Sequence, residues 1–265
     1  MADERVIFIT GASSGLGLLT SVKLAKKGNQ VIAAIRDLHR KDELVELAQQ
    51  HDVSDRMELV QLDVSDEEQV FRVIDDVLHK YQKIDVLINN AGVAVNGFVE
   101  ELPLEKWRET FDTNFFGALA CTKAVLPQMR ERKSGYIINI SSVAGRIGQA
   151  IWGPYVASKF ALEGFSETLQ QEVEEFGINV AIIEPTPFKS KAEEKRKQNY
   201  YLNENSPYTE QAQRINEQFD QLLQNSMETN EVVQVIEDVL NEEKPKLRYP
   251  VGLVMDFHEK DIQPT

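Results

Sequence analysis

Short apolar runs rich in β-branched residues alternate with longer segments of helical periodicity along most of this chain. Strands that are apolar throughout are typical of a parallel sheet covered on both faces. Right-handed crossovers then place helices on both faces and gather the loops at the carboxyl ends of the strands. The pattern predicts an α/β fold with a doubly wound parallel sheet. The expected strands are Val6–Thr10, Gln30–Ile35, Met57–Leu62, Ile84–Asn89, Tyr136–Ile140, Ile178–Ile183 and Leu247–Val251.

A chain of 265 residues can form one such domain, and no linker or internal repeat divides it. The pattern breaks after Glu184, because Lys189–Glu210 is highly charged and has no apolar period. We predict a single domain over residues 1–265, with a mobile substrate lid at about residues 189–225. The expected helices are Gly15–Lys27, Arg40–Gln50, Glu67–Tyr81, Leu104–Arg130, Pro154–Phe176, Thr209–Gln224 and Asn230–Asn241.

Charge and cysteine content narrow the partners and the compartment. A net charge of −14 and a pI of about 4.8 argue against nucleic acid or an anionic membrane surface as a main partner. The single cysteine, Cys121, excludes an internal disulfide and fits a reducing compartment. Without a signal-peptide core or a bilayer-spanning run, we expect a cytoplasmic protein. The histidines lack paired ligand spacing, so no metal site is expected.

Tyr155 and Lys159 lie four residues apart in an expected helix, so their side chains project from one face. A lysine ammonium beside a tyrosine favours the phenolate and lowers the phenol pKa from its ordinary value of about 10. The pair would therefore donate and accept a proton near neutral pH. Taken alone, the spacing is weak evidence, since lysine and tyrosine often share a helix face.

A glycine-rich turn, with the sequence T-G-A-S-S-G-L-G over Thr10–Gly17, joins the first expected strand to the first expected helix. Glycines there let the backbone bend tightly and approach a pyrophosphate that sits on the free N–H groups of the helix start. The same residues match G-x-S-x-G, the nucleophile elbow of α/β-hydrolases, with Ser13 as nucleophile. Both chemistries use a strand, a turn and a helix in this order.

Three features weigh against the hydrolase. A triad needs an acid and then a histidine after the serine, and the only late histidine is His258, near the C-terminus. An elbow after the first strand leaves little sheet before it. Tyr155 and Lys159 would also have no role. Dinucleotide binding is therefore the first interpretation, and a serine hydrolase is an alternative.

Taken in order, these motifs resemble those of the short-chain dehydrogenase/reductase family. The likeness runs from about Arg5 to Val251 and comprises T-G-x-x-x-G-x-G, N-N-A-G, an asparagine, a serine and Y-x-x-x-K. The stretches I-R-D-L and Q-L-D-V resemble the 17β-hydroxysteroid and retinol dehydrogenase-like branch. The resemblance implies a seven-stranded Rossmann sheet with helices on both faces and a nicotinamide cofactor.

Carried over by position, the resemblance makes Asn114, Ser142, Tyr155 and Lys159 the catalytic group. Tyr155 would give a proton to a carbonyl oxygen during reduction, or take it from an alcohol during oxidation. Lys159 would favour the phenolate and bind the nicotinamide ribose, and Ser142 would hydrogen-bond the substrate oxygen. Asn114 would hold a water near Lys159 and extend a proton relay. The hydride chemistry belongs to the cofactor.

The resemblance also implies a set of residues that line the cofactor. Asp63 matches an aspartate that contacts adenine, although a helix N-cap is its alternative role, for which Ser65 and Asp66 are better placed. Asn90 would also brace the central strands. The expected cofactor-binding residues are Gly11, Ser13, Ser14, Gly15, Leu16, Gly17, Arg36, Asp63, Val64, Asn90, Ala91, Gly92, Tyr155, Lys159, Pro185, Phe188 and Ser190.

The chain departs from the family pattern after the strand at Ile178–Ile183. The usual Pro-Gly pair is Pro185-Thr186 here, and threonine cannot freely take the φ values open to glycine. Phe188 and Ser190 stand where the family has an aliphatic residue and a threonine that contact the nicotinamide carboxamide. These departures leave a second alternative, a nucleotide-binding protein with reduced or lost catalysis.

The end of the second expected strand bears on the choice of cofactor. NAD-binding members have an acid there that accepts from the ribose 2′-OH, and this chain has Ile35. The next residue, Arg36, suits a 2′-phosphate through a charge-assisted contact, whereas Asp37 lies two places beyond the acid position. We expect NADP(H) rather than NAD(H), with a merely solvated Arg36 as the alternative.

The expected activity is therefore NADP(H)-dependent interconversion of a ketone or aldehyde and an alcohol. Apolar residues on loops at the carboxyl ends of the strands indicate a small apolar carbonyl or alcohol as substrate. Because Leu104–Arg130 and Pro154–Phe176 carry many apolar residues, some facing a partner, we also expect a homodimer or homotetramer. The expected substrate contacts are Val143, Ala144, Ile147, Trp152, Tyr155 and Phe188, with Tyr200 and Tyr201 as contacts from the lid.

Overall fold

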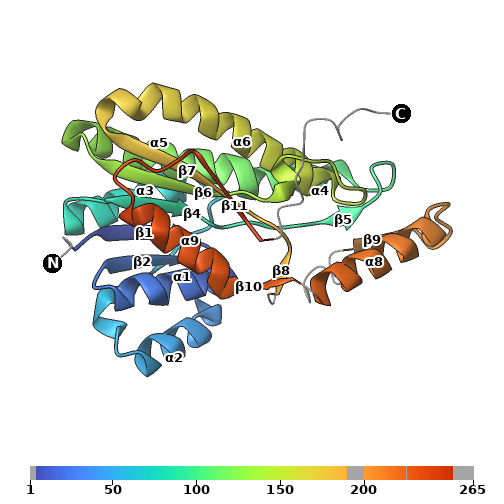
Figure 1. Cartoon of the computed structure of the whole chain (residues 1–265), viewed down its shortest axis with the longest axis horizontal. Coiled ribbons are helices and arrows are strands. Elements are labelled where there is room, and N and C mark those ends of the chain that lie inside the picture. The colour runs from blue at the N-terminus through green and yellow to red at the C-terminus, as the bar shows by residue number, and fades with distance from the viewer. Residues whose placement is uncertain (1–3, 190–199, 225, 253–265) are drawn as a thin grey trace.

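A seven-stranded parallel sheet forms the centre of the protein, in the order β11-β7-β6-β4-β1-β2-β3. The computed structural model describes residues 4–189, 200–224 and 226–252. Its arrangement confirms the doubly wound α/β fold expected from the sequence (Figure 1). The strands are β1 Val6–Thr10, β2 Gln30–Ile35, β3 Met57–Gln61, β4 Val86–Asn89, β6 Gly135–Ile140, β7 Ile178–Pro185 and β11 Arg248–Val251.

Helices cover both faces of this sheet and bury two apolar cores. One core lies between the sheet and α1, α2 and α9, and the other between the sheet and α3, α5 and α6. Neighbouring residues of one strand enter opposite cores, as Ile7 and Phe8 of β1 do, so a central strand is apolar throughout. These helices are α1 Gly15–Lys26, α2 Asp42–Gln50, α3 Glu67–Tyr81, α5 Gly117–Arg132, α6 Gly153–Val173 and α9 Thr229–Asn241.

The single long helix expected over Leu104–Arg130 is interrupted in the structure. Helix α4, Leu104–Phe111, leads into a π-helical turn at Asp112–Phe116 and then into α5. A π turn widens the helix by one residue and occurs frequently at functional sites. Its sequence keeps the apolar periodicity of a helix, so the pattern alone did not predict the break.

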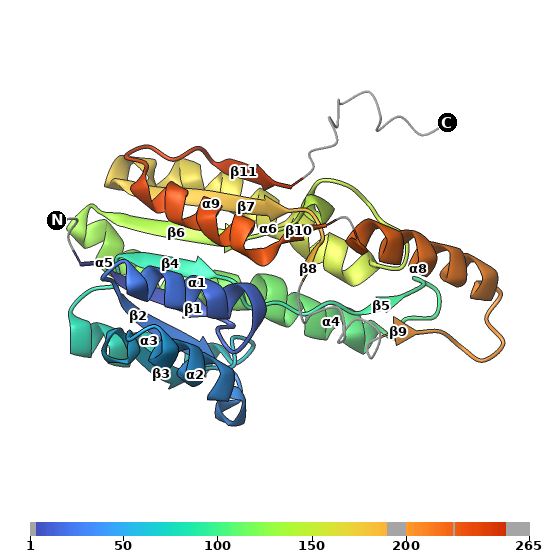
Figure 2. The same ribbon diagram turned by 60° about the horizontal axis from the view of Figure 1, so that its bottom comes forward.

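A helical segment lies beyond the carboxyl ends of the sheet strands. Helix α8, Thr209–Gln224, projects past this edge together with β5, Asn96–Gly97, and β9, Tyr200–Tyr201, which pair with each other (Figures 1 and 2). A second short ladder joins β8, Phe188–Lys189, to β10, Met227–Glu228. The β5–β9 ladder ties the segment that follows β7 to the main domain, and the β8–β10 ladder joins the two ends of that segment.

Candidate active site

The glycine-rich turn between β1 and α1 forms a cradle of backbone N–H groups. Gly11 and Gly15 have φ of +70° and +58°, a left-handed conformation that glycine adopts without strain. Ser14 precedes α1 without capping it through its side chain, so the first N–H groups of the helix stay available. The positive end of the helix dipole lies at the same place, which favours a pyrophosphate.

The turn is held against β4 by the N-N-A-G motif. The Asn90 side-chain amide donates to the carbonyl oxygens of Thr10 and Gly11, at 2.8 Å and 3.2 Å. In return, the Thr10 hydroxyl accepts from the backbone N–H groups of Asn90 and Ala91, both at 3.0 Å. The N-N-A-G motif therefore fixes the shape of the cradle across two neighbouring strands.

Asn90 thus braces β1 against β4, as expected, and the first asparagine of this motif extends the bracing to β6. The buried Asn89 amide donates to Asn139 on β6 at 2.8 Å and to Thr122 on α5 at 3.2 Å. Asn139 in turn donates to the Ser166 hydroxyl on α6 at 2.8 Å. Polar residues inside otherwise apolar strands are the signal that could have indicated this chain of bonds.

Helix α6 presents Tyr155 and Lys159 one turn apart, as the sequence predicts. The Lys159 ammonium is buried, lies 5.6 Å from the centre of the Tyr155 ring, and donates to the Ile140 carbonyl at 2.7 Å. Burial lowers the pKa of Lys159 to about 8, partly offset by the charge of Glu163. The proline at the second helical position, Pro154, preorganises this end of the helix.

The phenol pKa differs from the expectation. Burial raises the pKa of Tyr155 above its ordinary value of 10, and a hydrogen bond with the Ser142 hydroxyl offsets this only in part. The expectation of a lowered phenol pKa is wrong, because burial disfavours the phenolate, and the Lys159 ammonium donates its hydrogen bond to Ile140. Tyr155 is therefore a protonated acid at neutral pH.

Ser142 reaches the tyrosine from the end of β6. Its hydroxyl oxygen accepts from the Ala144 N–H at 3.1 Å and caps a short 3-10 turn, Val143–Gly145. The same hydroxyl contacts the Pro185 carbonyl at 3.4 Å, at the end of β7. Ser142 and Tyr155 thus meet where both strands finish, which agrees with the expected placement.

Asn114 occupies the π turn and joins two parts of the site. Its carboxamide exchanges hydrogen bonds with the backbone N–H and C=O of Val93, at 2.8 Å and 2.9 Å. It also donates to the hydroxyl of Ser158, the residue before Lys159, at 3.0 Å. Asn114 therefore links the N-N-A-G loop to α6. The water that we expect beside Asn114 remains a prediction.

At the far end of the cradle, Asp63 folds back on its own loop. Its carboxylate accepts from the Ser65 N–H at 3.1 Å and from the Ser65 hydroxyl at 2.7 Å. Asp66 caps α3 by accepting from the Gln69 N–H at 3.0 Å, so the N-cap belongs to Asp66 and not to Asp63. Val64 is buried and packs closely against Gly117, at the start of α5.

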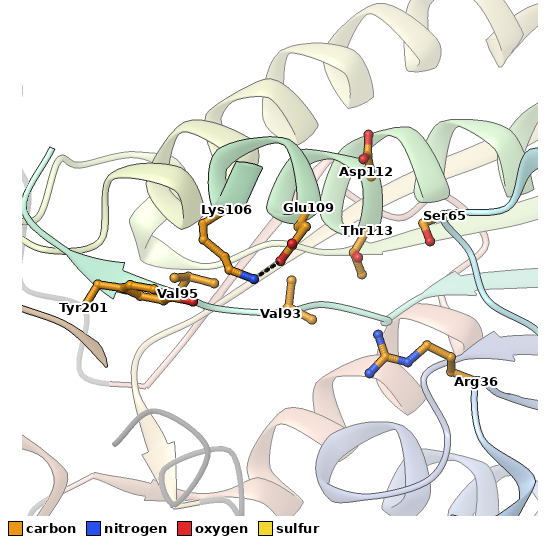
Figure 3. Close-up of a pocket in the computed structure, with 9 residues that line it drawn as sticks. All are labelled: Arg36, Ser65, Val93, Val95, Lys106, Glu109, Asp112, Thr113 and Tyr201. Carbon is orange, nitrogen blue, oxygen red and sulfur yellow. Dashed lines mark hydrogen bonds and ion pairs between the residues drawn. The ribbon is translucent and has the colours of Figure 1, made fainter. Parts of the chain in front are cut away.

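Arg36 leaves the end of β2 and lines a pocket of about 290 Å³ beside this loop (Figure 3). Across the pocket, Lys106 of α4 pairs with Glu109 at 2.6 Å. Within the described residues, no carboxylate forms an ion pair with Arg36, so its guanidinium is available to a ligand. The lining residues are Arg36, Ser65, Val93, Val95, Lys106, Glu109, Asp112, Thr113 and Tyr201.

The chain accommodates Thr186 in place of the family glycine. Thr186 is not among the described residues with positive φ, so its backbone needs no glycine. Its N–H donates to the Val251 carbonyl at 2.9 Å. Gly252 provides the space for the side chain, because a Cβ built on Gly252 would overlap the Thr186 hydroxyl. The threonine therefore fits this position without backbone strain.

The next two positions expected to contact nicotinamide are placed less fully. Phe188 is partly buried, pairs with Met227 between β8 and β10, and packs against the core that includes α9. Part of the Phe188 ring therefore packs in the core and does not face the expected nicotinamide site. Ser190 lies outside the described residues.

Aromatic side chains cover the tyrosine on its outer side. The Trp152 ring lies 5.9 Å from the ring of Tyr155 and 5.3 Å from that of Phe219 on α8. Val143 and Ile147 are partly exposed nearby, whereas Ala144 is buried at 2% exposure. The sequence reasoning missed Phe219, although the amphipathic pattern of its helix indicated an inward face.

Ile151 has a strained backbone next to this aromatic group. Its φ is +65°, an uncommon conformation for a β-branched residue. Burial of its side chain and a 2.9 Å hydrogen bond from the Gly97 N–H to its carbonyl hold it in place. Strain of this kind clusters at ligand sites, and Ile151 directly precedes Trp152, whose ring lies 5.9 Å from that of Tyr155. No sequence motif signalled it.

The described residues contain neither a membrane-spanning helix nor a cluster of metal-ligating side chains. No helix in that part of the chain is apolar over a length that would cross a membrane. Nor do three His, Cys, Asp or Glu side chains there gather as metal ligands would.

Comparison with known proteins agrees with this geometry. A family model described as short chain dehydrogenase matches residues 5–201. The chain is 39% identical over 253 residues to the uncharacterized oxidoreductase YusZ of Bacillus subtilis, covering 94% of this chain and 90% of that protein. It is 43% identical over 189 residues to human retinol dehydrogenase 8, covering 70% of this chain and 60% of that protein.

A solved structure shows the same likeness over nearly the whole chain. The short-chain dehydrogenase from Streptomyces avermitilis superposes with a TM-score of 0.82 at 37% identity, covering 94% of this chain and 89% of that one. These matches contradict the serine-hydrolase interpretation of the turn at Gly11–Gly17. The chain belongs to the short-chain dehydrogenase/reductase family and is an oxidoreductase of that family.

Proposed function

We propose that this protein is an NADP(H)-dependent oxidoreductase that interconverts an apolar ketone or aldehyde and the matching alcohol. The observation that carries the proposal is the meeting of Ser142, Tyr155 and Lys159 at the sheet edge that also holds the N–H cradle. A panel of ketones, aldehydes and quinones tests it, with oxidation of NADPH and NADH followed by absorbance. Oxidation of NADPH by none of these compounds would contradict it.

The nicotinamide group supplies or accepts the hydride when bound, and the side chains handle the proton. Tyr155, held protonated by its surroundings, donates its proton from Oη to the substrate oxygen during reduction. The Ser142 hydroxyl, beside that oxygen, stabilises the charge that develops there. Lys159 stabilises the phenolate that remains, since a positive charge close to Tyr155 favours the ionised form. Oxidation follows the same path in reverse.

Arg36 favours NADP(H) in this proposal. Its guanidinium opens into the pocket beside Ser65 and Thr113, and forms no ion pair with the acids of the described residues. Solved family members include complexes with NADP+ and with NAD, so the family alone leaves both possible. A 2′-phosphate placed in this pocket would gain a charge-assisted contact that NAD cannot make.

Replacing Arg36 by leucine should weaken NADPH binding by about 1.5–3 kcal/mol, the range for hydrogen bonds to charged groups. NADH binding should stay nearly unchanged, because NADH has no 2′-phosphate. Fluorescence titration with both cofactors measures the difference. Arg40→Leu is a matched control, since Arg40 is exposed in the same loop and does not line the pocket. Equal losses for the two cofactors would contradict the assignment.

An acid introduced at Ile35 would not test cofactor preference separately from stability. Ile35 is 1% exposed and packs in the core between the sheet and α1, α2 and α9. A carboxylate there would be buried among apolar side chains, at a large cost in stability. Cofactor preference is therefore best tested at Arg36 alone.

The aromatic cover supports an apolar substrate. Trp152 and Phe219 extend from the ring of Tyr155 toward α8, so a bound substrate would meet apolar surface beside its reacting carbon. One relative takes its name from retinol, an apolar alcohol of this general kind. We infer that α8 acts as the cover of the substrate site, and that its opening and closing admit the substrate.

Phe219→Ala should raise KM for a bulky apolar ketone by about tenfold, within the range for loss of contacts in a hydrophobic pocket. KM for a two- or three-carbon carbonyl should change little, because such a substrate does not reach α8. Steady-state kinetics with both substrates measure the split. Leu222→Ala on the same helix is the control, since Leu222 is 45% exposed. A uniform change for both substrates would show that α8 does not contact the substrate.

A further inference from the structure

A buried group of charges lies directly behind the catalytic helix. Glu163 on α6 and Glu184 on β7 are both almost fully buried. Arg248, from β11, joins them, since its Nε lies 3.1 Å from a Glu163 oxygen and 3.3 Å from a Glu184 oxygen. Its guanidinium also pairs with the half-exposed Glu167, one turn further along α6. Arg146 pairs with Glu184 at 3.3 Å from the outer side.

Inside this group, two buried carboxylates share one cation that is itself largely buried. Glu163 and Glu184 both contact Arg248, whereas Arg146 and Glu167 are half exposed. Buried charges are strongly unfavourable unless they are compensated nearby. A further cation close to Glu163 would therefore stabilise the buried end of the group.

Lys159 is that cation. It precedes Glu163 by four residues on α6, so the two side chains lie on the same face of the helix, and both are buried. The other groups at Lys159 are the Tyr155 phenol on α6 and the Ile140 carbonyl on β6. Glu163 is the charged group that acts on the ionisation of Lys159, and it favours the protonated form.

The same carboxylate also supports the turn that carries Ser142. A Cβ built on Gly145 would lie 3.0 Å from Glu163 Cγ and 3.2 Å from Glu163 Oε1. It would also lie 2.8 Å from the buried Ser141 hydroxyl. Burial raises the pKa of the Glu163 carboxyl above its ordinary value, and the Ser141 hydroxyl and Arg248 offset this in part by favouring the charged form. Glu163 belongs to α6, the helix that carries Tyr155 and Lys159. Its side chain packs against the turn at Gly145 that follows Ser142.

We propose that Glu163 is a positioning residue that keeps Lys159 protonated, with Arg248 of β11 holding the carboxylate in place. The proposal deepens the proposed function, on which it rests for the role of Lys159 in the reaction. Burial disfavours the charged ammonium of Lys159, and the negative charge of Glu163 counteracts this effect. Through Glu163, the last sheet strand helps to set the charge beside the reacting tyrosine.

The test is the pKa of Lys159 itself, measured in the ligand-free protein by NMR of ¹³Cε-labelled lysine, with Lys159→Met to assign the signal. In the unchanged protein we expect a pKa of about 8. Glu163→Gln keeps the shape and removes the charge, so the pKa should fall by about half a unit to one unit. An unchanged pKa in a folded Glu163→Gln variant overturns the proposal.

Two further variants make the sign of the effect decisive. Arg146→Gln removes a half-exposed cation from the group, so the Lys159 pKa should rise, and this variant serves if Glu163→Gln does not fold. A fall or no change in the folded Arg146→Gln variant overturns the proposal. Glu172→Gln is the matched control, because this exposed glutamate of α6 lies outside the group and should leave the Lys159 pKa unchanged.

Kinetics separate this proposal from the function on which it rests. If both hold, the alkaline limb of kcat/KM for alcohol oxidation moves to lower pH in Glu163→Gln, by the same amount as the Lys159 pKa. If the pKa falls and the alkaline limb stays, Glu163 sets the charge of Lys159 as proposed, and the role assigned to Lys159 in the reaction is wrong.

Discussion

Tyr155→Phe is expected to lower turnover by about 10²–10⁴-fold, the usual contribution of a positioned acid or base. The substitution removes the hydroxyl that meets Ser142 and keeps the ring that packs on Trp152. Affinity for NADPH should therefore change little. The measurement combines carbonyl reduction under substrate saturation with fluorescence titration of the cofactor.

A second tyrosine provides the control for this experiment. Tyr81, at the end of α3, donates from its hydroxyl to Glu58 at 2.5 Å. Glu58 lies on β3, the edge strand of the sheet. Tyr81→Phe removes a hydroxyl that is less deeply buried than that of Tyr155 and lies away from the site, so its turnover should stay normal. Near-full activity in Tyr155→Phe would show that another group transfers the proton and that the proposed mechanism is wrong.

The sheet could be predicted from the sequence because its strands are buried on both faces. In such strands most residues are apolar, and β2 has the bounds predicted for it, Gln30–Ile35. Strand β7 runs two residues past its predicted end, to Pro185, because its last residues pair with β11. The local sequence pattern predicts where a strand forms. Where the strand ends depends on its pairing with a strand that is distant in the sequence.

Which residues meet at the candidate site could also be predicted, whereas their electrostatics could not. Tyr155, Lys159 and Ser142 meet as their motif implies. The direction in which the phenol pKa shifts depends on how deeply the hydroxyl is buried and on which group accepts the hydrogen bond from Lys159. Neither can be inferred from the spacing of the two residues. The pair Glu163 and Arg248 is separated by 85 residues, so only the fold brings these charges together.

The accommodation of Thr186 shows the same limit. The sequence shows a glycine replaced by a threonine and suggests a damaged site. The structure shows the space moved to Gly252, which has a φ of +107° and lies against the threonine side chain. A substitution that looks harmful at one position can be compensated by a residue that only the fold makes its neighbour.

Gly17→Ala is expected to weaken NADPH and NADH binding together, by up to about a hundredfold. A Cβ at Gly17 would lie 2.5 Å from the Gly11 carbonyl oxygen and would overlap the Asn90 amide. The turn must then move away from α1, which disrupts the cradle used by the pyrophosphate that both cofactors share. Overpacking of this kind costs about 1–3 kcal/mol, so a lower melting temperature should accompany the loss of binding.

Gly164→Ala separates this steric effect from the general effect of removing a helical glycine. Gly164 lies within α6, has no positive φ, and its added Cβ would meet nothing within 4 Å. This variant should bind both cofactors normally and gain about 0.4–1 kcal/mol in stability, since alanine restricts the unfolded chain. Fluorescence titration and thermal unfolding of the two variants side by side measure the contrast. Normal cofactor binding by Gly17→Ala would show that the dinucleotide does not depend on the turn between β1 and α1, and the site would have to be placed elsewhere.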